Sequence, residues 1–271
     1  MKIALIYDRV NKIGGAEKVL LAIREIWQNI PLFCAVYNPR GAPWAASFKK
    51  IIPSFLQKIP FVNKAHEFFP WLTPVAFNSF DLDNYDVIIS VTSAEAKYVI
   101  TSPKQLHICY CLTPTRYLWS GYSQYRQNPG FGRLNFLAGS FFWAAAPILR
   151  MKDWLSAQRP NYYVAISREV QKRIRKYYGR ESEIIYPPVE INKFKVQKGE
   201  FLRNAKFKIN KEAYFLVVSR LVPYKNVDLI IKTFNELGWV LKIIGKGNQL
   251  NYLKKMAKKN IEFLGEVDDI Q

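Results

Sequence analysis

Short apolar runs alternate with amphipathic segments along the chain, and this alternation constrains the fold more than any other feature. Residues 2–8 (KIALIYD), 31–37, 85–92 and 106–112 are typical of short buried strands, and residues 14–27 (GGAEKVLLAIREIW) carry apolar side chains at helical spacing. Strands that alternate with helices favour a parallel sheet covered by helices on both faces. The sequence therefore predicts an α/β fold.

The pattern stops and then starts again. Residues 190–201 (EINKFKVQKGEF) are polar and charged without a clean period, and three strand-like runs with two helical segments follow them. A length of 271 residues also suits two domains, since about 100 to 200 residues form one. We predict domains at 1–195 and 196–271. The second has few elements for a core, so we expect its sheet to be incomplete.

Local signals define two further helices. Ser167, with Glu169 behind it, is a helix N-cap, and the helix that it starts is predicted to end at Gly179. The apolar stretch 134–150 is too short and too interrupted for a membrane span, which needs about 20 apolar residues. A core helix is favoured there over an interfacial one, and no transmembrane segment is predicted.

Residues 51–80 remain ambiguous. Their prolines fall at irregular spacing among seven aromatic side chains, which forbids one long helix. The segment is either an excursion that faces lipid or acceptor, or a set of short helices on the sheet edge.

The charge balance limits the partners. The chain has 40 Lys and Arg against 21 Asp and Glu, a net charge of +19, which favours nucleic acid, an anionic membrane surface or phosphorylated substrates. With three cysteines, the chain cannot pair all of them in disulfides. Because it has only two histidines, a zinc site is also improbable. We expect buried, reduced thiols in a cytosolic protein.

The stretch SRLVPYKNVD (219–228) gathers charge at a strand end. Arg220 and Lys225 flank a Val-Pro turn that follows an apolar run and precedes a helical segment. Arginine can hold a diphosphate with its planar fork, lysine adds a point charge, and a helix N-terminus attracts anions. Single surface charges are the plainer interpretation, but the position favours an anion site.

Two glycine pairs lie in similar places. Gly14 and Gly15 precede the first helix, and Gly245 and Gly247 follow a later strand. Glycine lets a phosphate or sugar approach the backbone closely, although neither pair has the spacing of a dinucleotide fingerprint. A plain turn into a helix is the alternative for Gly14 and Gly15.

Four segments together carry a resemblance: GGAEKVL, CYCLTPTRYLW (109–119), AISREVQKRIRKYYGRESEIIYPPV and VVSRLVPYKNVDLII. They resemble the bacterial retaining glycosyltransferases of family 4, which have the GT-B fold, and among these the mannosyltransferases of surface-polysaccharide assembly. The resemblance implies two Rossmann-like domains, the acceptor on the first, the nucleotide-sugar donor on the second, and no metal or other cofactor.

The resemblance also implies roles for residues. Arg220 and Lys225 match the pair that holds the donor diphosphate, so both are expected to be catalytic. Gly14 and Gly15 match the loop that faces the donor across a cleft, and Gly245 and Gly247 are further expected donor-binding residues. Leu112 stands where relatives commonly have a histidine. Two glutamates eight residues apart, which grip the donor in this family, would lie beyond Gln271, so we expect the chain to be incomplete for catalysis.

The predicted function is transfer of a sugar, with mannose as the candidate, to a polysaccharide or lipid-linked acceptor with retention. The alternative is a non-catalytic relative that binds a nucleotide sugar or a partner transferase. A nucleic-acid binder is a third hypothesis, but no recognised motif supports it and we expect no nucleic-acid partner. Basic side chains and the segment 51–80 favour reversible attachment to the cytoplasmic face of an anionic membrane.

Overall fold

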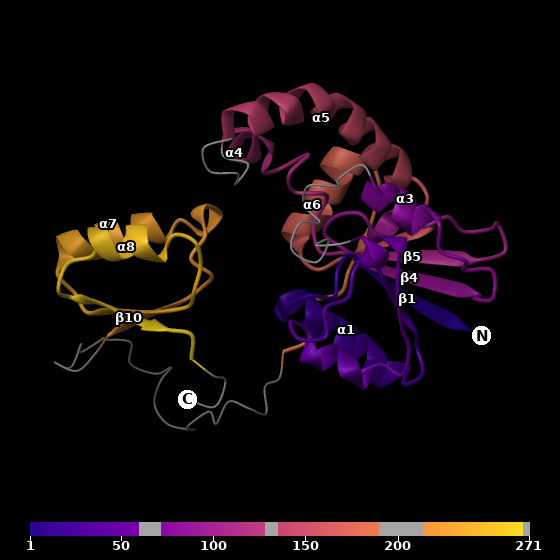
Figure 1. Cartoon of the computed structure of the whole chain (residues 1–271), viewed down its shortest axis with the longest axis horizontal. Helices are drawn as coiled ribbons and strands as arrows, with labels where there is room; N and C mark the ends of the chain where they lie inside the picture. Colours follow the sequence, from indigo (N-terminus) through magenta and orange to yellow (C-terminus); the bar gives the residue numbers. More distant parts are fainter. Residues whose placement is uncertain (60–71, 128–134, 190–213, 268–271) are drawn as a thin grey trace. The chain divides into compact units, whose positions relative to one another are not determined.

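The computed structural model describes residues 1–59, 72–127, 135–189 and 214–267. They fall into two compact units (Figure 1). Unit 1 comprises Met1–Phe194 and unit 2 comprises Lys195–Gln271. Each unit combines a parallel sheet with helices, so the predicted α/β class is confirmed.

The sheet of unit 1 contains seven described strands in the order β3-β2-β1-β4-β5-β6-β7, and every pairing is parallel. The chain moves outward from β1 to β3 on one side and returns to pair β4 with β1. Such a reversal places the ends of two loops side by side, where ligands of open α/β sheets bind. The strands are β1 (Ile3–Tyr7), β2 (Leu32–Cys34), β3 (Ile51–Pro53), β4 (Val87–Thr92), β5 (Leu106–Cys111), β6 (Tyr162–Ala165) and β7 (Glu183–Ile184).

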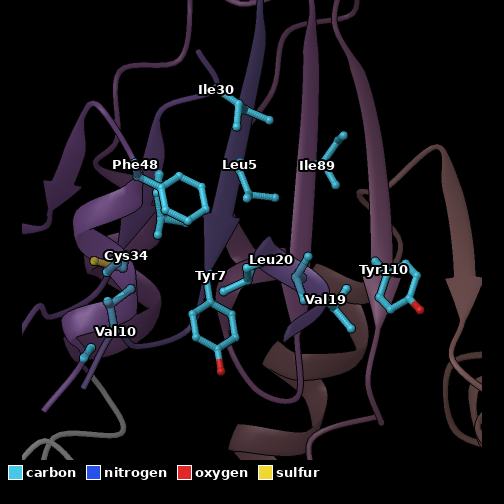
Figure 2. Packing of buried hydrophobic residues seen from close by; sticks show 14 residues of the cluster. Leu5, Tyr7, Val10, Val19, Leu20, Ile30, Cys34, Phe48, Ile89 and Tyr110 are labelled. Atoms are coloured by element: carbon cyan, nitrogen blue, oxygen red, sulfur yellow. The ribbon is translucent and has the colours of Figure 1, made fainter. Parts of the chain in front are cut away.

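Helices cover both faces of this sheet because side chains of a strand alternate between its faces. Leu5 and Tyr7 of β1 pack with Leu20 of α1 on one face (Figure 2). Ile6 packs with Phe77 of α3 on the other. The described helices are α1 (Gly15–Ile26), α3 (Leu72–Asn78), α4 (Tyr122–Gln127), α5 (Asn135–Ala157) and α6 (Arg168–Tyr178), with short helical turns η1 (Pro43–Ser47), η2 (Phe55–Lys58) and η4 (Ala96–Tyr98).

The predicted ends of α6 are confirmed. The Ser167 hydroxyl accepts a hydrogen bond from the Val170 backbone N–H at 3.2 Å, and Gly179 adopts the left-handed conformation with φ 66°. Glycine is favoured there because it has no Cβ to clash. By contrast, the strand predicted at 182–189 shrinks to Glu183–Ile184, since the prolines behind it have no N–H for the ladder.

Two expectations for unit 1 need correction. The apolar stretch 134–150 is predicted as a core helix, but α5 runs on to Ala157 and buries only one face, with Leu149 inside and Trp143 and Ile148 exposed. In the ambiguous segment 51–80, the described part forms β3, η2 and α3 packed on the sheet, as in the second interpretation; residues 60–71 lie outside the described residues.

Unit 2 has three described strands, all parallel, in the order β10-β9-β8: β8 (Phe215–Val218), β9 (Leu241–Ile244) and β10 (Ile261–Gly265). Figure 1 shows α7 (Val227–Leu237) and α8 (Leu250–Met256) on the same side of this sheet. Ile231 and Leu253 of these helices pack on Leu241 and Ile243 of β9. The alternation predicted for 214–267 is thus confirmed.

All three cysteines are buried and free, as predicted. In the described part of the chain, no helix combines the length and the apolar character that crossing a membrane requires.

Candidate functional site

The predicted site residues follow the carboxyl ends of the strands in both units. Gly14 and Gly15 end the loop after β1, Arg220 and Lys225 lie after β8, and the glycine pair at 245 and 247 lies after β9. Because the strands of each sheet are parallel, these ends share one edge of it, where open α/β sheets receive ligands.

Asp8, directly after β1, organises the edge of unit 1. Its Oδ1 accepts hydrogen bonds from the Thr92 hydroxyl at 2.7 Å and the Ala96 backbone N–H at 2.8 Å, and its Oδ2 accepts one from the Ser93 N–H at 2.8 Å. The Asp8 side chain is buried. A carboxylate that accepts several backbone and hydroxyl donors fixes the loop after β4 against the end of β1.

Glu95 joins three loops. This buried carboxylate accepts hydrogen bonds from Arg9 Nη2 at 3.1 Å and from the Tyr117 hydroxyl at 2.7 Å. Burial raises the pKa of Glu95, and the neighbouring Arg9 charge opposes that rise without cancelling it. The sequence prediction missed this cluster, although Arg9 and Glu95 each follow a predicted strand, which was the available signal.

The loop after β5 adds one unsatisfied polar atom. Thr113 is 6% exposed, and its hydroxyl has no hydrogen-bond partner among the described residues. Buried polar atoms are usually paired, so this hydroxyl is a candidate contact for a ligand or water. The preceding Leu112 is partly buried and packs on the apolar cluster of β1 and α1.

A buried ion pair holds this loop in place. Lys97 Nζ lies 2.7 Å from Asp153 Oδ1 of α5, and both side chains are almost wholly buried. Asp153 also accepts hydrogen bonds from Thr115 Oγ1 and Trp119 Nε1, each at 2.7 Å, and from the Tyr178 hydroxyl at 2.9 Å. Burial lowers the pKa of Lys97, but the Asp153 carboxylate more than compensates, so the pKa is raised overall. Lys97 therefore remains a cation.

The two glycines at the start of α1 have different surroundings. Gly14 is the N-cap of α1, and a Cβ there would lie 3.1 Å from Glu17 Oε2. A Cβ on Gly15 would meet nothing within 4 Å. Among the described residues, packing therefore does not require glycine at position 15, and the space beside its backbone at the start of the helix is open.

Unit 2 presents two exposed cations on one loop. Arg220 donates from Nη2 to the Tyr224 hydroxyl, and its guanidinium lies 5.8 Å from the centre of the Tyr224 ring. Lys225 ends the turn η7 (Pro223–Lys225), and Asn226, with φ 51°, leads into α7. The structure thus brings Arg220 and Lys225 together before a helix N-terminus, as the sequence predicts.

Neither cation is neutralised by the neighbouring ion pairs. In the described part of unit 2, the ion pairs join Lys242 to Glu262 and Lys246 to Glu266, and they leave Arg220 and Lys225 outside. Two cations outside these ion pairs, at the start of a helix whose first turn also carries Asp228, form a candidate anion site.

The second glycine pair has a packing role. A Cβ on Gly245 would lie 1.9 Å from the Ser219 carbonyl oxygen, and one on Gly247 would lie 2.1 Å from the Leu221 carbonyl oxygen. Gly245 also has φ 138°. There is no room for these Cβ atoms because the backbone of the loop after β9 packs directly against the loop that carries Arg220. Packing alone thus explains both glycines, and their donor-binding role stays a prediction.

Comparison with protein families gives one match. Residues 199–271 match the model described as "Glycosyl transferases group 1". A search of curated proteins finds no match. The match is confined to the part of the chain that carries Arg220 and Lys225.

Comparison with solved structures gives matches across almost the whole chain. A structure of HepE from Anabaena, in complex with UDP and glucose, is 17% identical with a TM-score of 0.59, covering 100% of this chain and 71% of that one. Sucrose-phosphate synthase from Thermosynechococcus elongatus is 10% identical with a TM-score of 0.62, covering 99% and 71%. TarM of S. aureus, with UDP among its ligands, is 10% identical with a TM-score of 0.52, covering 98% and 78%. At these identities the likeness shows the fold, which is of the GT-B class.

Proposed function

We propose that the chain is a nucleotide-sugar-dependent glycosyltransferase in which Arg220 and Lys225 bind the donor diphosphate. One observation carries the proposal: two exposed cations share the loop between β8 and the N-terminus of α7, inside the segment that matches the group 1 glycosyltransferase model. The UDP in the HepE and TarM structures supports a nucleoside diphosphate as ligand.

The chemistry explains why cations belong at this place. The nucleoside diphosphate gains negative charge as the sugar leaves, so fixed cations stabilise the transition state more than the bound substrate. Arg220 can hold two phosphate oxygens with its planar fork, Lys225 adds a point charge, and the N–H groups at the start of α7 contribute their dipoles. These groups require no metal.

The acceptor is proposed to bind at the carboxyl edge of unit 1. The Thr113 hydroxyl, which has no hydrogen-bond partner among the described residues, supplies a hydrogen-bonding group suited to a sugar hydroxyl. We propose that Gly14 and Gly15 approach the donor. Gly245 and Gly247 are proposed to shape the loop that carries Arg220 and Lys225. Retention, mannose as the sugar and a polysaccharide or lipid-linked acceptor are finer proposals that rest on the family 4 resemblance.

Calorimetry with UDP, GDP and CDP tests the phosphate site. A charge-assisted contact contributes about 1.5 to 3 kcal/mol, so Arg220→Ala and Lys225→Ala should each weaken binding roughly 10- to 100-fold. Lys232→Ala is the matched control, since it removes an exposed positive charge from α7 of the same unit. Unchanged binding by the first two variants, or an equal loss in the control, would place the phosphate elsewhere.

A second candidate function is nucleotide-sugar binding without transfer. Leu112 favours it, because this apolar side chain packs on the core at the edge where the resemblance places a histidine. Incubation with radiolabelled nucleotide sugars and membrane lipid extract separates the two functions. Labelled product, from this chain or from a version extended by any in-frame downstream sequence, supports the transferase; tight binding of the donor without product by both supports the second candidate.

A further inference from the structure

Helix α5 exposes an apolar face along four turns. Trp143, Ile148, Met151, Trp154 and Leu155 are 56%, 53%, 57%, 44% and 54% exposed. Ala144 and Pro147 are exposed beside them. We call these seven residues the α5 stripe. Figure 1 shows the helix at the rim of unit 1, with α4 beside it.

The exposed side chains of the stripe form one continuous strip along the helix. Successive helical residues turn by about 100°, so its seven members occupy an arc of about 140°. The opposite side of the same helix is buried, with Ala146, Leu149 and Asp153 facing the protein. The helix therefore presents apolar side chains both to the protein and to the outside. A surface helix of a soluble protein normally turns a polar face outward. Such a stripe calls for something to cover it.

Charge next to the stripe indicates what covers it. Lys152 is exposed on α5 itself, and α6, which packs against α5, exposes Lys172, Arg175 and Lys176. Between residues 135 and 178 the chain has eight Lys and Arg (150, 152, 159, 168, 172, 173, 175, 176) against two acidic residues (153, 169). Asp153 is buried, Glu169 pairs with Arg173, and Glu181, just after this range, pairs with Arg175. Lys152, Lys172 and Lys176 lie outside the ion pairs of the described residues.

We propose that the α5 stripe is a membrane-docking surface that lies in the headgroup region of an anionic bilayer. Tryptophan prefers this region because its ring is apolar and its N–H is polar. An in-plane helix gains affinity from buried apolar area and from cations that attract anionic lipids. The surface differs from the segment 51–80, on which the sequence-based expectation of membrane attachment rests, and it does not depend on the proposed sugar transfer.

Co-sedimentation of the full chain with vesicles tests the proposal without any nucleotide. Vesicles of phosphatidylcholine with and without about one third phosphatidylglycerol would be compared at rising salt, since screening weakens attraction between exposed charges. Ile148→Ser/Met151→Ser should reduce the fraction bound to anionic vesicles at least fivefold. Lys152→Glu should reduce it by a smaller factor and make binding less sensitive to salt.

Leu229→Ser/Leu237→Ser is the matched control, because it removes two exposed leucines from α7 in unit 2. This control should bind vesicles like the unchanged chain, and circular dichroism should show that every variant is folded. Equal binding by the stripe variant and the control would overturn the proposal. Equal binding to neutral and anionic vesicles would also overturn it. So would a dimer in solution that Ile148→Ser/Met151→Ser converts to a monomer, since a second copy would then cover the stripe.

Discussion

The two units use charged side chains at their sheet edges in opposite ways. In unit 1, Glu95, Lys97 and Asp153 are buried, and each is paired with partners from other loops or helices. In unit 2, Arg220 and Lys225 are exposed and lie outside the ion pairs of the described residues. The difference indicates that unit 1 uses its charges to fix its own loops, whereas unit 2 leaves Arg220 and Lys225 exposed, where we propose that they bind the donor diphosphate.

This division separates stability from binding. A buried charge that loses its partner costs far more free energy than an exposed one, because it remains out of water without compensation. An exposed cation can instead be removed with little effect on folding. Substitutions in unit 1 should therefore act on unfolding, and substitutions of the unit 2 cations should act on ligand affinity.

The largest effect is expected at the buried ion pair. Asp153→Asn removes the carboxylate charge and leaves the Lys97 ammonium buried beside Thr115 and the Ala94 carbonyl. The free energy of unfolding should fall by about 3 to 5 kcal/mol, measured by urea denaturation with circular dichroism.

The control for this prediction is an exposed pair in unit 2. Lys246→Gln breaks the ion pair with Glu266, whose side chain is 63% exposed, and should cost less than about 1 kcal/mol. A loss of the same size in both variants would contradict the proposed division between the units.

The sequence could not have predicted the buried pair. Lys97 and Asp153 are 56 residues apart, and each belongs to a segment whose own pattern gives no sign of the other. The caps of α6 were predictable because Ser167 and Gly179 act within one turn of the helix. β3 was not, because a three-residue strand that ends in proline has too few positions for a period.

The second prediction concerns Gly245, which lies beside the loop that carries Arg220. Gly245→Ala would place a Cβ 1.9 Å from the Ser219 carbonyl oxygen, at a residue with φ 138°. The clash and the strained backbone should destabilise unit 2 by about 2 to 3 kcal/mol. Hydrogen exchange resolved by segment should show faster exchange in β8 and β9 while α1 and β4 are unaffected. Faster exchange throughout unit 1 would show that the two units do not unfold separately.

The third prediction is a loss of stability in acid that starts in unit 1. Burial, with a smaller contribution from Arg159, lowers the pKa of His107 to about 3, and its Nε2 lies 2.8 Å from the Ser90 hydroxyl. As pH falls, His107 binds a proton near pH 6.5 in the unfolded chain but only near pH 3 in the folded chain. The stability of the folded chain therefore falls as pH is lowered between these values. From pH 7 to pH 5 this residue should cost about 2 kcal/mol.

His107→Gln provides the comparison, because glutamine does not titrate. As pH falls from 7 to 5, the unchanged chain should lose about 2 kcal/mol more unfolding free energy than this variant. Glu95 has the opposite sign, since a raised carboxyl pKa makes the folded chain bind protons more tightly and favours it in acid. An identical pH dependence of both chains would mean that His107 has the same pKa in the folded and the unfolded chain.

The site was predictable only where its residues are close in sequence. Arg220 and Lys225 are five positions apart on one loop, so a strand end and a helix start were enough to place them together. The Arg9–Glu95–Tyr117 cluster joins loops after three different strands. Finding it required the strand order β1-β4-β5, which the alternation of strands and helices does not specify.

The smallest effect on stability is expected at Gly15. A Cβ there meets nothing within 4 Å, so Gly15→Ala should fold normally. Alanine also restricts the unfolded chain more than glycine does, and the free energy of unfolding should change by less than about 1 kcal/mol, with a gain favoured. If the backbone at Gly15 receives the donor, however, the added methyl group occupies the space that the sugar needs. The affinity for the nucleotide sugar should then fall at least tenfold, while the affinity for free UDP, which we propose Arg220 and Lys225 hold, stays the same. Lys18→Ala, on the same helix, is the control and should leave both quantities unchanged. Unchanged affinity for the nucleotide sugar in Gly15→Ala would remove Gly15 from the donor site and restrict the proposed donor contacts to unit 2.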